Sequence, residues 1–135
     1  MALLLDTSFV IALEMARDNQ HKAALKYWQA YVQNPQPLVT TDLVFAEIVT
    51  FFNARGLHAK AVEVGDRLVQ SQLVEIVNMT PELSQQAWTF FKRHGDKQYS
   101  LADCASFIVM NKRRITRALT FDDHFTQAGF TVLPE

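Results

Sequence analysis

The chain has 135 residues, of which 49% are hydrophobic and 20% are charged, and its 13 Lys and Arg nearly balance its 14 Asp and Glu. This composition predicts a single soluble domain, residues 1–135, that buries roughly two thirds of its unfolded surface without disulfides or a structural metal. The one cysteine excludes an intrachain disulfide scaffold and suits a reducing, cytoplasmic compartment. The apolar runs are too short to span a membrane, and the net charge of -1 argues against coating of nucleic acid through overall charge.

Short β-like runs alternate with longer amphipathic stretches, which is typical of helices layered on a mainly parallel sheet. The apolar run 3–5 is the first expected strand. The pattern next predicts helices over 9–15 and 21–32, a strand over 38–40, helices over 43–54 and 58–70, and a strand over 73–77. Asn34 and Pro35 form the turn that ends the second helix, and Asp42 is the expected cap of the third.

The second half of the chain opens with a clear helix start, because Thr80 can cap the helix and Pro81 suits its first position. This helix is expected to reach about Arg93 and to end at Gly95. A helix over 100–113, strands over 118–121 and 130–133, and a short helical segment between these strands follow. The whole pattern predicts one α/β domain with a central, mainly parallel sheet of four to five strands.

Two acids directly follow expected strands: Asp6 comes after 3–5 and Asp122 comes after 118–121. In a parallel sheet both positions lie at the carboxyl edge, where open α/β sheets bind their ligands. Each aspartate could instead cap the next helix, and the sequence leaves both interpretations open. Asp123 follows Asp122, and only one of two consecutive side chains normally faces a given point.

Two further acids lie near expected helix starts. Glu47 interrupts an apolar stripe that includes Leu43 and Val44, so we expect its carboxylate to face the core, where a charge is costly unless it is paired or bound to a cation. The alternative, an exposed Glu47, requires the hydrophobic side of that helix to turn toward water. Asp103 stands three residues after Ser100, a spacing that also fits a helix capping box.

If two strand ends and two helix starts share one edge of the sheet, these four acids converge. Clustered carboxylates cannot all stay ionised without a cation. Oxygen ligands, with no cysteine pair and no close histidine pair, favour Mg²⁺ or Mn²⁺ over zinc. Such an ion polarises phosphate oxygens and activates a water molecule, so the pattern indicates phosphoester hydrolysis. Cys104, beside Asp103, is interpreted as a small buried hydrophobe rather than a nucleophile.

With these positions in hand, the chain resembles the PIN-domain nucleases, and most closely the small single-domain toxins of the VapC type in bacterial toxin–antitoxin pairs. The likeness covers nearly the whole chain. It is carried by Leu-Leu-Asp-Thr-Ser at 4–8, Ala-Glu-Ile at 46–48, Ser-Leu-Ala-Asp-Cys at 100–104, Ala-Leu-Thr-Phe-Asp at 118–122, His-Phe at 124–125 and Ala-Gly-Phe at 128–130. Each motif is weak alone, and the order and spacing of all of them carry the resemblance.

The resemblance implies a three-layer α/β/α domain with helices on both sides of the sheet. It also implies a set of metal ligands that carry the catalysis, namely Asp6, Glu47, Asp103 and Asp122. Ser8 and Thr120 match hydroxyl positions that support this cluster. The Thr-x-Asp motif selects Asp122 over Asp123, which stays an auxiliary acid candidate.

The implied activity is that of an endoribonuclease that uses one or two Mg²⁺ or Mn²⁺ ions to hydrolyse structured RNA, leaving 5′-phosphate and 3′-hydroxyl ends. The implied partners are a small antitoxin protein, whose C-terminal segment covers the acidic pocket, and a second copy of the chain in a homodimer. A non-catalytic PIN-like module that binds RNA or protein is the alternative, which a replaced acid would favour; none is replaced. A structure-specific DNA nuclease shares the metal chemistry, but the chain has no length for a DNA-gripping insertion.

Basic residues are concentrated on either side of Asp103 in the sequence. Seven of the thirteen lie in one stretch: Lys92, Arg93, Lys97, Lys112, Arg113, Arg114 and Arg117. A phosphate backbone needs such cations beside an acidic pocket, so this group is a candidate RNA-binding surface. The alternative is a solvated helix end, where cations complement the helix dipole.

Overall fold

The computed structural model describes residues 1–135, and its strands and helices follow the predicted order. The strands are β1 (Leu3–Leu5), β2 (Leu38–Thr41), β3 (Val74–Val77), β4 (Arg117–Leu119) and β5 (Thr131–Leu133). The helices are α1 (Thr7–Glu14), α2 (His21–Tyr31), α3 (Asp42–Ala54), α4 (His58–Gln70), α5 (Pro81–Arg93), α6 (Leu101–Arg113) and α7 (Asp123–Gln127). No helix is both long enough and apolar enough to cross a membrane.

The five strands form one sheet in the order β3-β2-β1-β4-β5, and every neighbouring pair is parallel. The chain builds outward from β1 through β2 to β3, and then returns to add β4 and β5 on the other side of β1. β1 and β4 therefore flank the point where the strand order reverses. In open α/β sheets this point, at the carboxyl ends of the strands, is where ligands bind.

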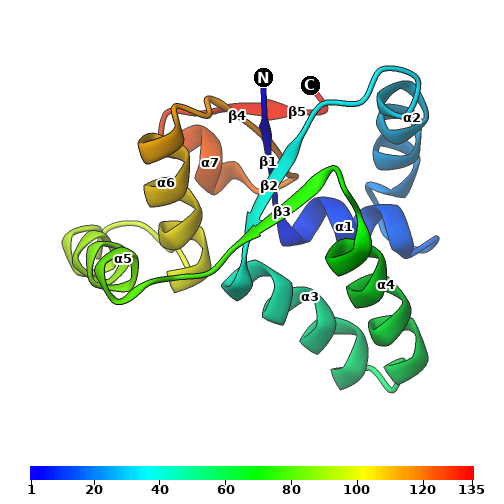
Figure 1. Cartoon of the computed structure of the whole chain (residues 1–135), viewed down its shortest axis with the longest axis horizontal. Coiled ribbons are helices and arrows are strands. Elements are labelled where there is room, and N and C mark those ends of the chain that lie inside the picture. The colour runs from blue at the N-terminus through cyan, green and yellow to red at the C-terminus, as the bar shows by residue number, and fades with distance from the viewer.

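Helices cover both faces of the sheet (Figure 1). Leu3 and Leu5 of β1 pack in the core beneath α1 to α4, whereas Leu4 packs in a second core beneath α5 to α7. Successive side chains of a strand point to opposite faces, so a strand that is buried on both sides must be apolar throughout. The predicted three-layer α/β/α architecture is confirmed.

Most differences from the predicted elements concern their ends. Asp42 is the first residue of α3 and not its cap, because Thr41 Oγ1 accepts the hydrogen bond from the Val44 N–H at 3.2 Å. β4 ends at Leu119, so Thr120 lies just beyond the strand, and its N–H still bonds the carbonyl of Leu133 at 3.0 Å. The side chain of Thr120 is thereby placed at the carboxyl edge of the sheet.

Candidate active site

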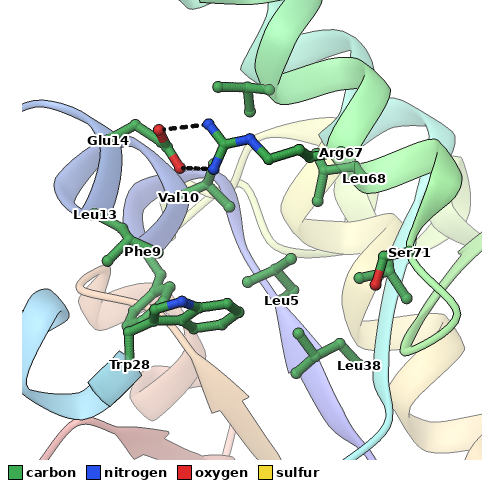
Figure 2. Close-up of a pocket in the computed structure, with 12 residues that line it drawn as sticks. Leu5, Phe9, Val10, Leu13, Glu14, Trp28, Leu38, Arg67, Leu68 and Ser71 are labelled. Atoms are coloured by element: carbon green, nitrogen blue, oxygen red, sulfur yellow. Dashed lines mark hydrogen bonds and ion pairs between the residues drawn. The ribbon is translucent and has the colours of Figure 1, made fainter. Parts of the chain in front are cut away.

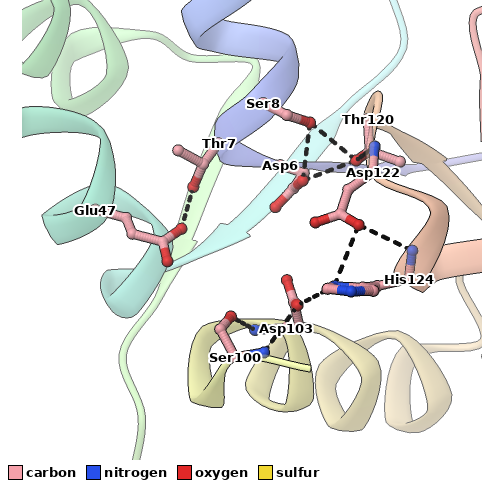
Figure 3. Close-up of polar contacts among 9 residues, drawn as sticks. All are labelled: Asp6, Thr7, Ser8, Glu47, Ser100, Asp103, Thr120, Asp122 and His124. Atoms are coloured by element: carbon pink, nitrogen blue, oxygen red, sulfur yellow. Dashed lines mark hydrogen bonds and ion pairs between the residues drawn. The ribbon is translucent and has the colours of Figure 1, made fainter. Parts of the chain in front are cut away.

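A pocket of about 390 Å³ opens at the carboxyl edge of the sheet, beside the ends of β1 and β4. Its wall comes from α1, α3, the start of α6 and the turn that leads into α7. The lining residues are Asp6, Thr7, Ser8, Ile11, Glu47, Phe51, Gln98, Ser100, Asp103, Asp122 and His124. All four predicted acids are among them, and Figure 3 shows their carboxylates around a common space.

Asp6 is the most buried of the four acids, with only 4% of its surface exposed. It occupies the N-cap position of α1, yet its side chain makes no capping hydrogen bond. Its Oδ2 atom instead accepts hydrogen bonds from Thr120 Oγ1 at 2.7 Å and from Ser8 Oγ at 3.1 Å. The side chain is therefore held by the hydroxyls of the pocket and not by the helix that it precedes.

Ser8 and Thr120 also bind the backbone of the turn before α7. Ser8 Oγ accepts a hydrogen bond from the Phe121 N–H at 2.9 Å, and Thr120 Oγ1 accepts one from the Asp122 N–H at 3.0 Å. The two hydroxyl oxygens lie 3.1 Å apart. This network joins the start of α1 to the turn, so the two hydroxyls fix the position of Asp6 and of the turn that carries Asp122.

The pocket contains more acidic than basic groups. Burial raises the pKa of Asp6 from 3.8 to about 6; the Thr120 hydrogen bond lowers it, and the nearby charges of Asp103 and Asp122 raise it further. No Lys or Arg forms an ion pair with any of the four acids. Carboxylates that lie this close need a cation to stay ionised together.

His124 contacts two of the acids, a role that the sequence analysis did not predict, although His-Phe at 124–125 is one of the motifs of the family resemblance. Its Nδ1 atom lies 2.9 Å from Asp103 Oδ2 and 3.2 Å from Asp122 Oδ1. One ligand atom from each of the three residues lies within 4.8 Å of the others. The available signal was the position of His124 immediately after two acids at a helix start, a position that carries no information about Asp103.

Asp103 and Asp122 each have two roles. Asp103 forms the predicted capping box, because its N–H donates to Ser100 Oγ at 2.9 Å and its Oδ2 accepts from the Ser100 N–H at 3.0 Å. Asp122 caps α7 by accepting from the His124 N–H at 2.9 Å. Both carboxylates also line the pocket, so their capping hydrogen bonds do not exclude them from it.

Glu47 lies in the pocket for a different reason from the one expected. The prediction that it faces the core is wrong, because its side chain is exposed, whereas Val44, Ile48 and Phe52 form the buried stripe of α3. Glu47 precedes Ile48 by one residue, which turns it about 100° away from that stripe. Its carboxylate accepts a hydrogen bond from Thr7 Oγ1 at the mouth of the pocket.

Two other residues weighed from the sequence lie outside the pocket wall. Asp123 is exposed on the first turn of α7, which leaves Asp122 as the pocket acid of this pair. Cys104 is fully buried, and burial, together with the charge of Asp103, raises the pKa of its thiol to about 11. A thiol with this pKa is protonated at neutral pH, so it supplies no nucleophile.

The seven basic residues do not form one surface. Lys92, Arg93 and Lys97 lie at the end of α5 and in the loop that leads to Ser100 at the pocket. The other four, Lys112, Arg113, Arg114 and Arg117, lie at the far end of α6 and the start of β4, roughly 15 Å along the helix axis from Asp103. Arg113 there forms two hydrogen bonds with Glu75, at 2.6 and 2.8 Å.

A second and larger cavity, of about 470 Å³, lies away from the four pocket acids, among α1, α2, α4 and the first three strands (Figure 2). Its wall is mainly apolar and includes Phe9 and Trp28. One acid, Glu14, stands in this wall and binds Arg67 at 2.9 and 3.1 Å and Lys60 at 2.8 Å. Burial opposes its ionisation, but these two cations outweigh that effect and lower the pKa of Glu14.

Comparison with known proteins identifies related chains over almost the full length. The family model of the PIN domain matches residues 3–131. The 23S rRNA-specific endonuclease VapC20 of Mycobacterium tuberculosis is 37% identical over 134 residues, which cover 98% of this chain and 99% of that protein.

Solved structures agree with the sequence comparison. The crystal structure of Mycobacterium tuberculosis VapC20, described as a sarcin-ricin loop cleaving toxin, matches with a TM-score of 0.86 at 35% identity and covers 96% of each chain. VapBC2 from Rickettsia felis, bound to a DNA fragment from its promoter, matches with a TM-score of 0.69 over 98% of this chain and 97% of that chain. Its identity of 11% shows a shared fold alone.

Proposed function

The chain belongs to the PIN-domain family, and on this basis we propose that it is a divalent-metal-dependent endoribonuclease whose active site is the acidic pocket. One observation carries the proposal: four acids from distant parts of the chain line one pocket at the switch point of the sheet, and no Lys or Arg pairs with them. An acid such as Asp6, with a strongly raised pKa in a polar cleft, is typical of a functional site.

The donor atoms in the pocket fit a hard divalent ion. Asp6, Asp103 and Asp122 offer carboxylate oxygens from three sides of the pocket, and Glu47 offers a fourth from α3. Oxygen-rich sets of this kind suit Mg²⁺ or Mn²⁺. When bound, such an ion polarises phosphate oxygens and lowers the pKa of a coordinated water.

The protein's own contribution is to hold these carboxylates in place before substrate arrives. Thr120 and Ser8 bind Asp6 Oδ2, and His124 Nδ1 holds Asp103 Oδ2 beside the turn that carries Asp122. The hydrogen bond from Thr7 keeps Glu47 on the pocket side of α3. Such preorganisation avoids the cost of ordering the ligands during the reaction.

We propose structured RNA as the substrate, with 23S rRNA and its sarcin–ricin loop as the first candidate. The support is the identity of 37% with a 23S rRNA-specific endonuclease over almost the whole chain. Lys92, Arg93 and Lys97 are the predicted RNA contacts on the pocket side of the molecule. RNA contacts by Lys112, Arg113, Arg114 and Arg117 also stay predictions, and they would require an RNA that extends to the opposite edge of the sheet.

We also propose that the chain is the toxin of a toxin–antitoxin pair. A pocket with four acids and no Lys or Arg of its own suits an inhibitor that inserts an arginine, which pairs well with carboxylates. The proposed partner is a small antitoxin whose C-terminal segment covers this pocket. Self-association into a homodimer stays a prediction, and the mass of the purified protein under native conditions tests it.

The proposed activity is tested with purified protein, 23S rRNA and a hairpin of the sarcin–ricin loop sequence, in Mg²⁺ or Mn²⁺ and in chelator. We expect cleavage only with a metal ion, and we expect Asp6→Asn and Asp103→Asn to abolish it. Asp123→Asn is the matched control, because this exposed acid lies next to Asp122 but outside the pocket wall. Equal cleavage in chelator and in both pocket variants would refute the proposal, and RNA binding without cleavage would favour the non-catalytic alternative.

A further inference from the structure

Three different side chains, two on one face of α3 and one on its C-cap residue, lead away from the acidic pocket. Glu47 and Phe51 line the pocket, and Arg55 follows Phe51 at the same spacing of four residues. Residues four apart lie on the same side of a helix and are displaced by about 6 Å along its axis. A carboxylate, an aromatic ring and a cation are thus arranged in that order from the pocket outward.

The cation is held directly against the pocket wall. The guanidinium carbon of Arg55 lies 3.6 Å from the centre of the Phe51 ring, and Arg55 Nη1 donates to the Phe51 carbonyl at 3.0 Å. A cation is favourable at this position because it lies at the negative end of the helix dipole. The hydrogen bond to the Phe51 carbonyl uses one of the five N–H donors of the guanidinium, so most of the group is free to bind a ligand.

Arg55 has no acidic partner that would compete with a ligand. Arg67, Arg113 and Lys60 are each bound to glutamates, whereas Arg55 forms no ion pair and is exposed. An anionic RNA backbone that enters a pocket of four acids is repelled unless cations stand at the rim. A planar guanidinium with free donors matches the oxygens of a phosphate.

We propose that Arg55, positioned by its stacking on Phe51, binds the backbone phosphate of a nucleotide that neighbours the cleaved bond. This inference rests on the proposed ribonuclease function. Arg55 contributes to substrate binding and not to the chemical step, and Phe51 is a positioning residue that acts through it. The contact lies at the C-terminal end of α3 and is separate from the basic residues at 92–117.

The first test measures cleavage of the sarcin–ricin hairpin and, in chelator, its binding by fluorescence anisotropy at several salt concentrations. Arg55→Ala is expected to raise KM and Kd about tenfold, as expected for loss of a charged hydrogen bond, with kcat changed less than about twofold. The slope of log affinity against log salt should fall by about 0.7 to 0.9, the value for one lost phosphate contact. Arg55→Lys should retain the slope and recover part of the affinity.

Arg17→Ala is the matched control, because Arg17 is exposed in the turn after α1 and forms no ion pair. It should leave KM, Kd and the salt slope unchanged. Phe51→Leu keeps an apolar side chain but removes the ring, and is expected to weaken binding about two- to fivefold. The double variant Phe51→Leu/Arg55→Ala should bind no worse than Arg55→Ala alone, because the ring acts through the arginine.

The outcomes separate this inference from the function on which it rests. If the wild type cuts the hairpin but Arg55→Ala and Arg55→Lys keep its KM and salt slope, the inference is overturned and the ribonuclease stands. A loss confined to kcat also overturns it, because a binding contact would move KM. If the wild type neither binds nor cuts this RNA, the proposed function fails and the inference fails with it.

Discussion

Helix α1 has an acid at each end, and the surroundings of the two acids shift their pKa values in opposite directions. Asp6, at its start, lies in the acidic pocket with no Lys or Arg as partner, and its pKa is raised to about 6. Glu14, at its end, lies in the wall of the apolar cavity, where Arg67 and Lys60 lower its pKa. Both carboxylates are largely withdrawn from solvent.

The helix dipole alone predicts the reverse order. An acid is favoured at a helix N-terminus and disfavoured at a C-terminus, so Asp6 should be the stronger acid of the two. Burial and the presence or absence of cationic partners outweigh the dipole. Glu14 is paired with two cations and stabilises the fold, whereas Asp6 has no Lys or Arg partner. This difference indicates that Asp6 is the acid that serves a function.

The largest expected effect separates the two acids by activity. Asp6→Asn should reduce the initial rate of RNA cleavage by more than about 100-fold, because loss of groups that merely orient metal ligands already costs 10- to 100-fold. Glu14→Gln, measured at a temperature where it stays folded, should cut RNA within about twofold of the wild-type rate. Equal rates for the two variants would remove the functional distinction between the ends of α1.

The pH dependence of stability should differ in sign at the two ends. The pKa of Asp6 is higher in the folded than in the unfolded chain, so the folded state binds more protons between about pH 4 and pH 6, and stability without metal should fall as the pH rises through this range. The difference between 3.8 and about 6 corresponds to about 3 kcal/mol. Glu14 contributes stability that is lost as the pH falls through its lowered pKa.

Urea unfolding of wild type and Asp6→Asn across this pH range, in chelator, isolates the effect. The contribution of Glu14 is common to both proteins and cancels in the difference between their free energies of unfolding. The wild type should lose stability relative to Asp6→Asn as the pH rises from about 4 to 6. A constant difference between the two proteins would contradict the raised pKa.

Metal binding should also distinguish Asp6 from Glu14. If Mn²⁺ binds the folded chain but not the unfolded chain, Mn²⁺ at about 100 times its dissociation constant should raise the free energy of unfolding by about 2.7 kcal/mol. Asp6→Asn should lose most of this gain, while Glu14→Gln should keep it. Thermal unfolding with and without Mn²⁺ measures the effect, and an equal gain in all three proteins would place the ion elsewhere.

The smallest expected effect concerns the apolar cavity. Glu14→Gln removes the less exposed of the two acids that Arg67 and Lys60 share, and leaves these cations with Glu63 alone. It should cost about 1 to 2 kcal/mol, less than for a fully buried pair because both cations are partly exposed. Glu63→Gln, the more exposed acid of the same network, should cost less than about 0.5 kcal/mol. Equal costs for the two variants in urea unfolding would show that the cavity does not favour the Glu14 pairing.

The alternation of strands and helices could be predicted from local patterns, and the structure confirms it. The apolar run 3–5 and the helix start at Thr80 are encoded by neighbouring residues. The strand order could not be predicted in this way, because the placement of β4 beside β1 depends on pairing between Leu4 and Ala118. A local pattern contains no information about such distant partners.

The residues of the candidate site also differ in whether local sequence patterns could identify them. Asp6 and Asp122 were identified by their places after strands, and both line the pocket. Glu47 lines it too, but the stripe argument placed it on the wrong side of α3. His124 was missed because its contact with Asp103 crosses 21 residues of chain. The seven basic residues of the 92–117 stretch do not form the single surface that was predicted, because α6 separates the first three from the last four.

The hydrogen bond from Thr120 to Asp6 joins residues 114 positions apart. A polypeptide still being synthesised lacks Thr120 and Asp122, which follow β4, until long after Asp6 has been made. A nascent chain that has not yet emerged past Asp122 therefore cannot assemble the pocket, however well its first strands and helices have folded.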